Sequence, residues 1–282
     1  MADDCGCTGI RTCLQCEENK KSKNIFKDEQ SKKTMKKYEF CILCGETFLV
    51  DRECLHRKDV GNVKIKLEGI TVIQDFINEI EEETIVADIE KTVWKPSQSG
   101  RRKQDFGPQV NFKKRKLKLV NFTGLPQFSK VLVERMWSSV PHLSDFQPVE
   151  LCNLEYTPNR GSSIDPHFDD FWVWGERLVT LNLLSDSSLT FSVSGDTDNI
   201  EVSVPMPRRS LIIVQGPARY EWKHAIKRQD ILSRRIAVTL RELAQDFCEG
   251  GKSYTVGHEL IRTALSFKGE SVQVSIKKDR EG

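Results

Sequence analysis

The stretch SSIDPHFDDFWVWGERL places a histidine and two aspartates in front of a run of large apolar residues. Residues two apart in a strand project to the same face, so His167 and Asp169 would present an imidazole and a carboxylate to one point, whereas Asp170 would point away. Both groups bind divalent metals. Taken alone, the pair also fits a turn in which Asp169 hydrogen-bonds the backbone. The His-x-Asp pattern is common by chance, so by itself it does not establish a metal site.

A third metal ligand would have to come from a distant part of the chain, which contains only five histidines. His224 ends the strand-like stretch RYEWKH, 57 residues after His167. Two histidines and one carboxylate on one face of a metal form the facial triad of non-haem Fe(II) oxygenases, which leaves positions open for a co-substrate and O2. His167, Asp169 and His224 are therefore predicted to bind iron.

The segment RRIAVTLRE adds two arginines to this prediction. By strand parity, Arg235 and Arg241 share one face with a small residue and a hydroxyl. If that face lines a barrel interior, the guanidinium groups need an anionic partner. A dicarboxylate co-substrate would supply one, because arginine binds a carboxylate through two parallel hydrogen bonds. An exposed strand face with solvated arginines is the alternative.

The order of these fragments is His-x-Asp, a distant His, an Arg eleven residues later and a second Arg six residues further on. It resembles the AlkB-like family of Fe(II)/2-oxoglutarate dioxygenases. The stretches CNLEYTPNRGSS and SGRRKQDFG are similar to that family's co-substrate segment and substrate-side loop. The resemblance covers roughly residues 69–267 and implies Fe(II), 2-oxoglutarate and O2 as cofactor and co-substrates.

The resemblance also implies roles for individual residues. Arg235 would pair with the distal carboxylate of 2-oxoglutarate, and Arg241 would lie near its metal-bound end. Tyr156 would donate a hydrogen bond to the co-substrate, and Asn153 would contact it as well. The family spaces this Asn and Tyr two apart, whereas here they are three apart, so the Asn153 contact requires a bulge.

The reaction implied by the resemblance is oxidative demethylation of an N-methyl group, with release of formaldehyde, succinate and CO2. CGCTGIRTCLQC and WKPSQSGRRKQDFGPQVNF are most similar to one animal branch of the family, which points to methyl-lysine on a protein such as actin, with N6-methyladenine in DNA as a second candidate. A C–H hydroxylase and a non-catalytic zinc and nucleic-acid binding adaptor on the same barrel are the alternatives. The complete set of iron and arginine residues favours an enzyme over the adaptor.

Short β-branched and aromatic runs separated by turn formers fill residues 149–243 and predict a mainly β (α+β) sandwich or barrel. The resemblance makes this a double-stranded β-helix (jelly-roll) barrel with flanking helices. Residues 69–148 are expected to form a strand, a helix capped by Asn78 and Glu81, and a basic substrate loop. With a C-terminal helix at 254–268, residues 69–282 would form one dioxygenase domain.

The basic loop carries eight Lys or Arg and one Asp between Arg101 and Lys118, with Phe106 and Phe112 interleaved. Such a segment could bind nucleic acid through phosphate contacts and stacking. An acidic protein surface would suit the same charge. A solvated loop without a partner is the plain alternative.

Residues 1–68 are predicted to form a cysteine-rich, lysine-rich arm without a core of its own. Seven of the nine cysteines lie in the first 54 residues, and CxxC pairs are common zinc half-sites. Free thiols are the alternative to zinc. Two groupings of four thiolates would suit a structural zinc: Cys5, Cys7, Cys13 and Cys16, which we favour, or Cys13, Cys16, Cys41 and Cys44.

The composition does not indicate a secreted or membrane protein. The N-terminus MADDCGCTGI lacks a basic and apolar signal, and no run of about 18 apolar residues occurs. Clustered cysteines without a secretion signal favour a reducing compartment, so we expect a cytoplasmic and nuclear protein. The net charge of +2 does not mark a nucleic-acid-binding protein, so any electrostatic attraction of a partner would come from local charge.

Overall fold

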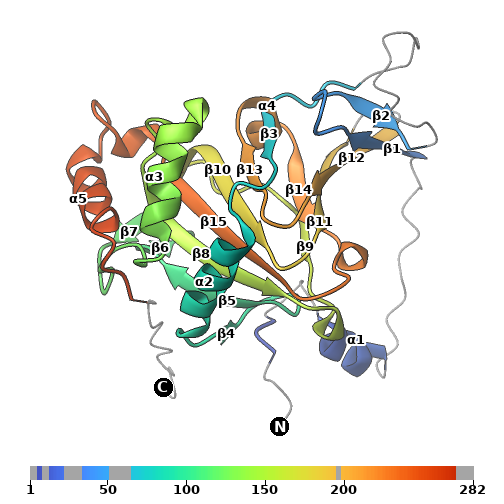
Figure 1. Cartoon of the computed structure of the whole chain (residues 1–282), viewed down its shortest axis with the longest axis horizontal. Coiled ribbons are helices and arrows are strands. Elements are labelled where there is room, and N and C mark those ends of the chain that lie inside the picture. Colours follow the sequence, from blue (N-terminus) through green and yellow to red (C-terminus); the bar gives the residue numbers. More distant parts are fainter. Residues whose placement is uncertain (1–4, 8–12, 22–33, 51–64, 195–197, 271–282) are drawn as a thin grey trace.

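The computed structural model describes residues 5–7, 13–21, 34–50, 65–194 and 198–270. Eight consecutive strands form its centre and are divided equally between two facing sheets (Figure 1). In chain order these strands are β8 (Pro148–Tyr156), β9 (Ile164–His167), β10 (Trp174–Leu183), β11 (Ser187–Ser194), β12 (Asp198–Met206), β13 (Leu211–Val214), β14 (Lys223–Ile226) and β15 (Arg235–Leu243).

The strand order confirms the predicted double-stranded β-helix. The larger sheet runs β3-β13-β10-β15-β8-β5-β4, and the smaller sheet runs β2-β1-β12-β11-β14-β9. Except for the β11–β12 hairpin, each of the eight central strands crosses to the opposite sheet, which is the connectivity of a jelly roll. Further strands are β3 (Ile70–Ile73), β4 (Lys95–Pro96), β5 (Arg102–Phe106), β1 (Thr34–Phe40) and β2 (Thr47–Leu49), and β6 (Gln109–Asn111) and β7 (Lys116–Lys118) form a separate hairpin.

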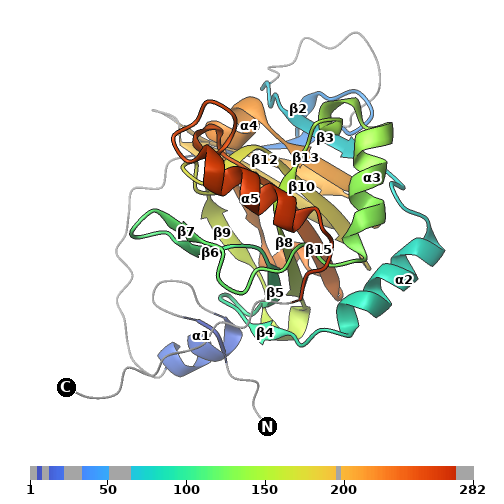
Figure 2. The same cartoon turned by 90° about the vertical axis from the view of Figure 1, so that its left-hand side faces the viewer.

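Three helices cover the outer face of the larger sheet (Figures 1 and 2). They are α2 (Glu79–Glu90), α3 (Ser129–Ser139) and α5 (Tyr254–Ala264). The predicted capping box of α2 is confirmed: the Glu81 amide donates to Asn78 Oδ1 at 2.9 Å, and the Asn78 amide donates to Glu81 Oε2 at 2.8 Å. Shorter helices are α1 (Leu14–Lys21), α4 (Gly216–Tyr220) and the 3-10 turns η1 (Pro141–Leu143), η2 (Pro158–Arg160), η3 (Arg228–Asp230) and η4 (Gln245–Phe247).

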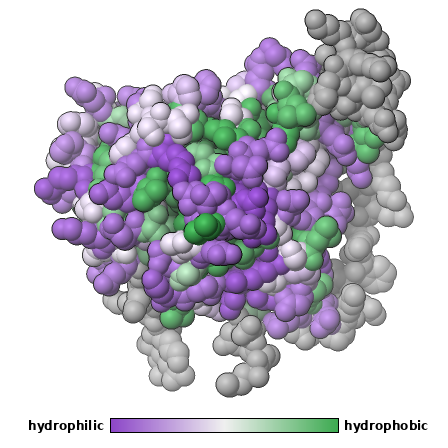
Figure 3. All heavy atoms as spheres, viewed as in Figure 1, coloured by the Kyte–Doolittle hydropathy of each residue, from purple (hydrophilic) through white to green (hydrophobic). Residues whose placement is uncertain are grey.

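Strand alternation divides the interior into two cores. One core lies between the larger sheet and the three helices, and the other lies between the two sheets. On β15, Ile236, Val238 and Leu240 face the helices, whereas Ala237 faces the smaller sheet. The face shown in Figure 3 is mainly hydrophilic with small, separate apolar patches, as is usual for a globular surface. No helix in the described part of the chain is long and apolar enough to cross a membrane.

The predicted boundary after residue 68 is wrong, because part of the arm belongs to the barrel. β1 pairs in parallel with β12, and β2 pairs with β1. Tyr38 and Phe40 are buried in the core between the sheets. These two apolar residues stand at alternate positions of β1, so one face of the strand packs into this core. Cys54, His56 and the lysine-rich stretch at 22–33 lie outside the described residues.

The basic segment at 101–118 divides into two parts. Arg101 and Phe106 are buried, and β5 pairs with β8 in the larger sheet, so stacking of a partner on Phe106 is ruled out. The β6–β7 hairpin instead carries Phe112, which is 52% exposed. Its exposed cations are Lys113, Lys114, Arg115, Lys116 and Lys118. The exposed cations of this segment therefore lie in its second part, whereas Arg102 and Lys103 of the first part are half-buried.

Candidate active site

The three predicted iron ligands meet where β9 and β14 run side by side. His167 is the last residue of β9 and pairs in register with His224 on β14, with ring centroids 4.4 Å apart. Asp169 follows two residues later, and its Oδ2 lies 3.2 Å from His224 Nε2. One ligand atom from each residue lies within 4.8 Å of the others. This is the donor set and spacing of a facial metal triad.

The local structure around the two histidines orients their rings. His167 Nδ1 lies 2.8 Å from the carbonyl oxygen of Asp165, which leaves Nε2 for a metal. His224 Nδ1 is buried and has no partner in the described part of the chain. The stretch RYEWKH, predicted as a strand, begins inside helix α4, and the strand starts only at Lys223. The helix arises because Pro217 at its first turn fixes a helical φ.

Electrostatics keep Asp169 ionised although its side chain is only 8% exposed. Burial raises the pKa of this carboxyl, but Arg241, His224 and His167 together lower it well below its ordinary value. Arg241 Nε donates to Asp169 Oδ1 at 2.8 Å, so the second oxygen faces the histidines. Arg241 Nη1 donates to Glu150 Oε2 at 2.6 Å. The half-buried pair Glu150 and Arg241 therefore fixes the orientation of the predicted metal ligand.

A cavity of about 70 Å³ between the sheets joins the triad to Arg235 and Tyr156. Arg235 is 2% exposed, and its Nε donates to Asn182 Oδ1 at 2.6 Å. Its Nη1 is buried without a partner among the described residues, and burial lowers the pKa of the guanidinium. Tyr156 pairs in register with Arg235, and its ring centroid lies 4.9 Å from the guanidinium carbon. A buried cation with a donor still free fits an anionic ligand such as the 2-oxoglutarate carboxylate.

Asn153 is the one predicted co-substrate residue that the structure does not bring to this cavity. It pairs in register with Val238, and its Nδ2 donates to Gln104 Oε1 at 2.8 Å on the helix side of the sheet. The register between β8 and β15 is unbroken from Asn153 to Tyr156, so the bulge that Asn153 required is absent there. Leu154 occupies the cavity-facing position two residues before Tyr156. The prediction for Asn153 is therefore wrong.

Two polar residues near the cavity were missed by the sequence analysis. Asn182 is fully buried, accepts from Arg235, and donates through Nδ2 to the carbonyl oxygens of Ser185 and Met206. Thr180 lines the cavity with Thr239, and their hydroxyl oxygens lie 3.2 Å apart. The sequence signal for Asn182 was a lone amide within the run TLNLL. A polar side chain in a buried strand needs a hydrogen-bond partner, and this requirement could have linked Asn182 to a buried donor.

The favoured cysteine grouping also comes together, on the outside of the barrel. Cys5 Sγ lies 3.3 Å from Cys16 Sγ, and Cys13 Sγ lies 3.7 Å from Cys16 Sγ. With Cys7 they form a group whose sulfur atoms are all within 4.8 Å of one another. Cys41 and Cys44, in the turn after β1, are not part of this group, so the alternative zinc grouping does not form.

Comparison with known proteins assigns the family. The chain is 44% identical over 298 residues to human alpha-ketoglutarate-dependent dioxygenase alkB homolog 4, covering 95% of this chain and 96% of that protein. The mouse protein of the same name is 42% identical, with 96% and 97% covered. The chain belongs to the AlkB family of Fe(II)/2-oxoglutarate-dependent dioxygenases. It is also 38% identical to DNA N6-methyl adenine demethylase of Caenorhabditis elegans, with 92% of this chain and 93% of that protein covered. No family model matches the chain.

Membership of this family makes the chain an enzyme, and the non-catalytic adaptor is excluded. Fe(II), 2-oxoglutarate and O2 are its cofactor and co-substrates. The orphaned Nη1 of Arg235 and the His, Asp, His donor set fit these groups in the cavity.

Proposed function

We propose that this chain is an oxidative N-demethylase that converts an N-methyl group to N–H and releases formaldehyde, succinate and CO2. The observation that carries the proposal is the buried Arg235 guanidinium, which lines the same cavity as the His, Asp, His triad and keeps Nη1 free. Bound Fe(II) would supply the oxidising chemistry with 2-oxoglutarate and O2. His167, Asp169 and His224 would hold it.

Arg235 and Tyr156 would bind the distal carboxylate of 2-oxoglutarate. Asn182 accepts from Arg235 Nε and thereby turns the two terminal nitrogens toward the cavity. Most of the cavity wall is apolar, contributed by residues of both sheets such as Leu178, Leu189 and Ile212. This wall would exclude water from the reacting groups, which strengthens every charge interaction inside.

For the methylated substrate we favour N6-methyladenine in DNA. The C. elegans relative is named for this activity. The exposed cations and Phe112 of the β6–β7 hairpin would contact phosphates and a base. Phe171 and Tyr220, 46% and 41% exposed with ring centroids 5.3 Å apart, form an aromatic surface two residues beyond Asp169.

A buried cation beneath these two rings favours a neutral base over a methylammonium group. The Arg219 guanidinium carbon lies 4.7 Å from the Phe171 centroid and 5.3 Å from the Tyr220 centroid. Arg219 Nη1 donates to the carbonyl oxygen of Asp169, so this surface adjoins the triad. A ring already paired with one cation attracts a second cation weakly, because the two positive charges repel each other.

Methyl-lysine on a protein such as actin is the second candidate, supported by acidic groups near Arg241. By strand parity, Glu150 and Asp105 lie on the cavity side of β8 and β5, and Cys152 between them donates to Asp105 Oδ1 at 3.3 Å. Carboxylates at this position would suit an ammonium group. A cytoplasmic and nuclear location is part of the proposal, because both substrates occur there and the described cysteines are free thiols.

Anaerobic titration of Fe(II) and 2-oxoglutarate tests the site. We expect the visible absorption of the Fe(II)–2-oxoglutarate complex in the wild type and in His142→Ala, which changes an exposed histidine outside the cavity. His224→Ala should lose it. No absorption in folded, iron-loaded wild-type protein would refute the assignment.

Product analysis tests the reaction and the substrate. With a methylated DNA oligomer and a methyl-lysine peptide assayed side by side, formaldehyde should accompany succinate on the DNA. Succinate with an oxygenated product and no formaldehyde would make the chain a hydroxylase instead. Formaldehyde from the peptide alone would reverse the substrate order.

A further inference from the structure

The four N-terminal cysteines have the geometry of a tetrahedral metal site. A Zn–S bond of about 2.3 Å gives a sulfur–sulfur edge of about 3.8 Å in a tetrahedron. The Cys5–Cys16 and Cys13–Cys16 distances of 3.3 and 3.7 Å are close to that edge, and all four sulfurs lie within 4.8 Å of one another. All four cysteines are free thiols and are not joined in disulfides, so each can offer a thiolate to a metal.

This cluster is built into the barrel rather than attached loosely to it. The backbone amide of Ser99 donates to Cys7 Sγ at 3.2 Å across 92 residues of sequence. A Cβ added to Gly6 would lie 2.8 Å from the backbone of Pro96, so only glycine permits this approach. On the other side of the cluster, Arg228 donates to both oxygens of Glu17 on α1, at 2.8 and 2.9 Å.

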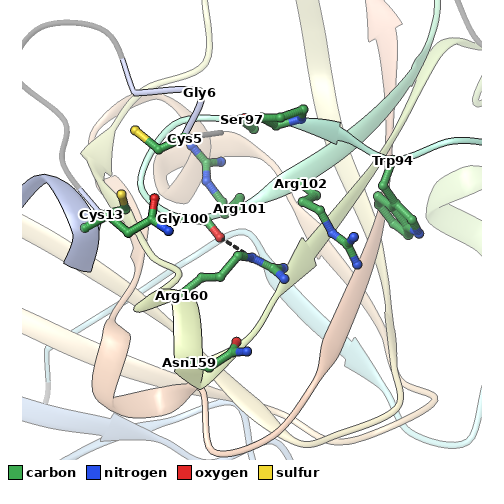
Figure 4. Close-up of a pocket in the computed structure, with 12 residues that line it drawn as sticks. Cys5, Gly6, Cys13, Trp94, Ser97, Gly100, Arg101, Arg102, Asn159 and Arg160 are labelled. Atoms are coloured by element: carbon green, nitrogen blue, oxygen red, sulfur yellow. Dashed lines mark hydrogen bonds between the residues drawn. The ribbon is translucent and has the colours of Figure 1, made fainter. Parts of the chain in front are cut away.

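The surrounding charge fits a metal–thiolate centre. Zinc with four thiolates carries a net charge of 2−, which would be costly to hold near the protein surface without cations. A cavity of about 140 Å³ has Cys5 and Cys13 on one side and arginines on the other, and the Arg101 guanidinium points toward Cys5 (Figure 4). Arg101, Arg102 and Arg160 line this cavity, and none of its described lining residues is a carboxylate; Arg102 and Arg160 share Glu155 as a partner.

The loop at 97–101 connects this cluster to the co-substrate end of the cavity. Arg101 is 6% exposed, and its guanidinium carbon lies 6.0 Å from the centroid of the Tyr156 ring. The guanidinium carbon of Arg235 lies 4.9 Å from the same centroid. Tyr156 therefore lies between the loop that the cysteines contact and the arginine proposed to bind the carboxylate.

The same loop is bonded to the turn between β8 and β9. The carbonyl oxygen of Gly100 accepts from Ser162 Oγ at 2.6 Å and from Arg160 Nε at 2.8 Å. The Ser163 amide donates to the carbonyl oxygen of Ser99 at 3.1 Å. This turn follows Tyr156 directly and leads into β9, which ends at His167. Displacement of the 97–101 loop would therefore move both Tyr156, on the co-substrate side, and β9, which carries the predicted metal ligand His167.

We propose that Cys5, Cys7, Cys13 and Cys16 bind Zn²⁺, and that this centre clamps the 97–101 loop so that Tyr156 and Arg235 are positioned for the co-substrate. A closed site with four protein ligands leaves no position for catalysis, so its role is structural. The clamp rests on the proposed role of Arg235, whereas the zinc site itself does not.

The test compares Cys13→Ser with Cys248→Ser, which changes a cysteine outside the cluster. Metal content is measured by elemental mass spectrometry, and the dissociation constants of Fe(II) and 2-oxoglutarate by anaerobic titration. We expect zinc in the wild type and in Cys248→Ser, and none in Cys13→Ser. In Cys13→Ser, 2-oxoglutarate should bind about tenfold more weakly, as expected when a supporting contact is lost, while Fe(II) affinity without co-substrate stays unchanged.

Arg101→Met tests the coupling with all four cysteines intact. It should retain zinc and weaken 2-oxoglutarate binding by a similar factor. If Cys13→Ser fails to fold, wild-type protein stripped by a chelator should regain tight 2-oxoglutarate binding when zinc is restored. Wild-type protein without zinc, or with iron in the thiolate site, would overturn the zinc assignment. Zinc loss with unchanged 2-oxoglutarate affinity would overturn the clamp. Zinc-loaded wild type that never binds 2-oxoglutarate would instead refute the proposed function.

Discussion

Replacing Arg235 by methionine separates a binding role from a structural one. The guanidinium is 2% exposed, donates to Asn182 Oδ1, and contacts the sulfur of Met206 at 3.7 Å and the ring of Tyr156, and it has no carboxylate partner among the described residues. A buried charge without an anionic partner costs several kcal/mol, so the protein without co-substrate carries this cost. Arg235→Met removes the charge and keeps much of the side-chain volume.

The two expected effects have different sizes. Removing a poorly compensated buried charge gains about 1–4 kcal/mol, and leaving Asn182 Oδ1 without its donor costs about 1–3 kcal/mol. The free energy of unfolding without co-substrate should therefore change by no more than about 3 kcal/mol. Loss of a buried guanidinium–carboxylate contact costs about 2–5 kcal/mol. This weakens 2-oxoglutarate binding about 30-fold to several thousand-fold.

The assay is denaturant unfolding with and without 2-oxoglutarate, together with anaerobic titration of Fe(II) and 2-oxoglutarate. Arg262→Met, an exposed arginine on α5, is the matched control. The wild type should be stabilised by the co-substrate, and Arg235→Met should not be. Equal losses of Fe(II) and 2-oxoglutarate affinity would refute the carboxylate role. So would a variant that is much less stable but still binds 2-oxoglutarate normally.

Three further variants test other features of the structure. Glu150→Gln weakens the hold on Arg241 and should lower Fe(II) affinity about tenfold in direct titration, with a smaller effect on 2-oxoglutarate. Burial raises the pKa of Glu155, but its arginine partners lower it further, to about 2. Ionised Glu155 therefore contributes about 3 kcal/mol to the free energy of unfolding above pH 4.5, and this contribution is lost as the pH falls toward 2. Between pH 7 and pH 3, the free energy of unfolding measured in urea should fall less in Glu155→Gln than in the wild type. The double variant Lys113→Glu, Lys114→Glu should reduce turnover of methylated DNA and its salt dependence without affecting a peptide; equal losses on both would place the hairpin outside the DNA contact.

The sequence predicted two pairs of site residues because the arrangement within each pair is local. His167 and Asp169 flank a strand end, and Arg235 and Arg241 lie on one strand, so a period of two is enough to place each pair. The failure of Asn153 has the same origin. An odd spacing from Tyr156 reverses the face, and an unbroken ladder leaves no bulge to restore it.

Features that depend on distant pairing could not be predicted in this way. Nothing local in TMKKYEF identifies β12 as its partner, because parallel pairing joins residues far apart in the chain. The burial of Arg101 is similar, since it depends on the cysteine segment and Tyr156 meeting around it. The role of Asn182 could not be predicted without knowing that Arg235 is the buried donor it faces.

Arg235 and Arg241 lie on the same face of one strand, yet their surroundings give them different tasks. Arg241 already has two carboxylates, Asp169 and Glu150, so its charge is compensated within the protein, and we infer that it orients the predicted metal ligand. Arg235 has no carboxylate partner among the described residues: its Nε donates to a neutral amide oxygen, and its Nη1 keeps a donor free. Because Arg241 is fully compensated and Arg235 is not, we expect Arg235 to bind an anion from solution. Co-substrate affinity, and not iron affinity, should therefore depend on Arg235.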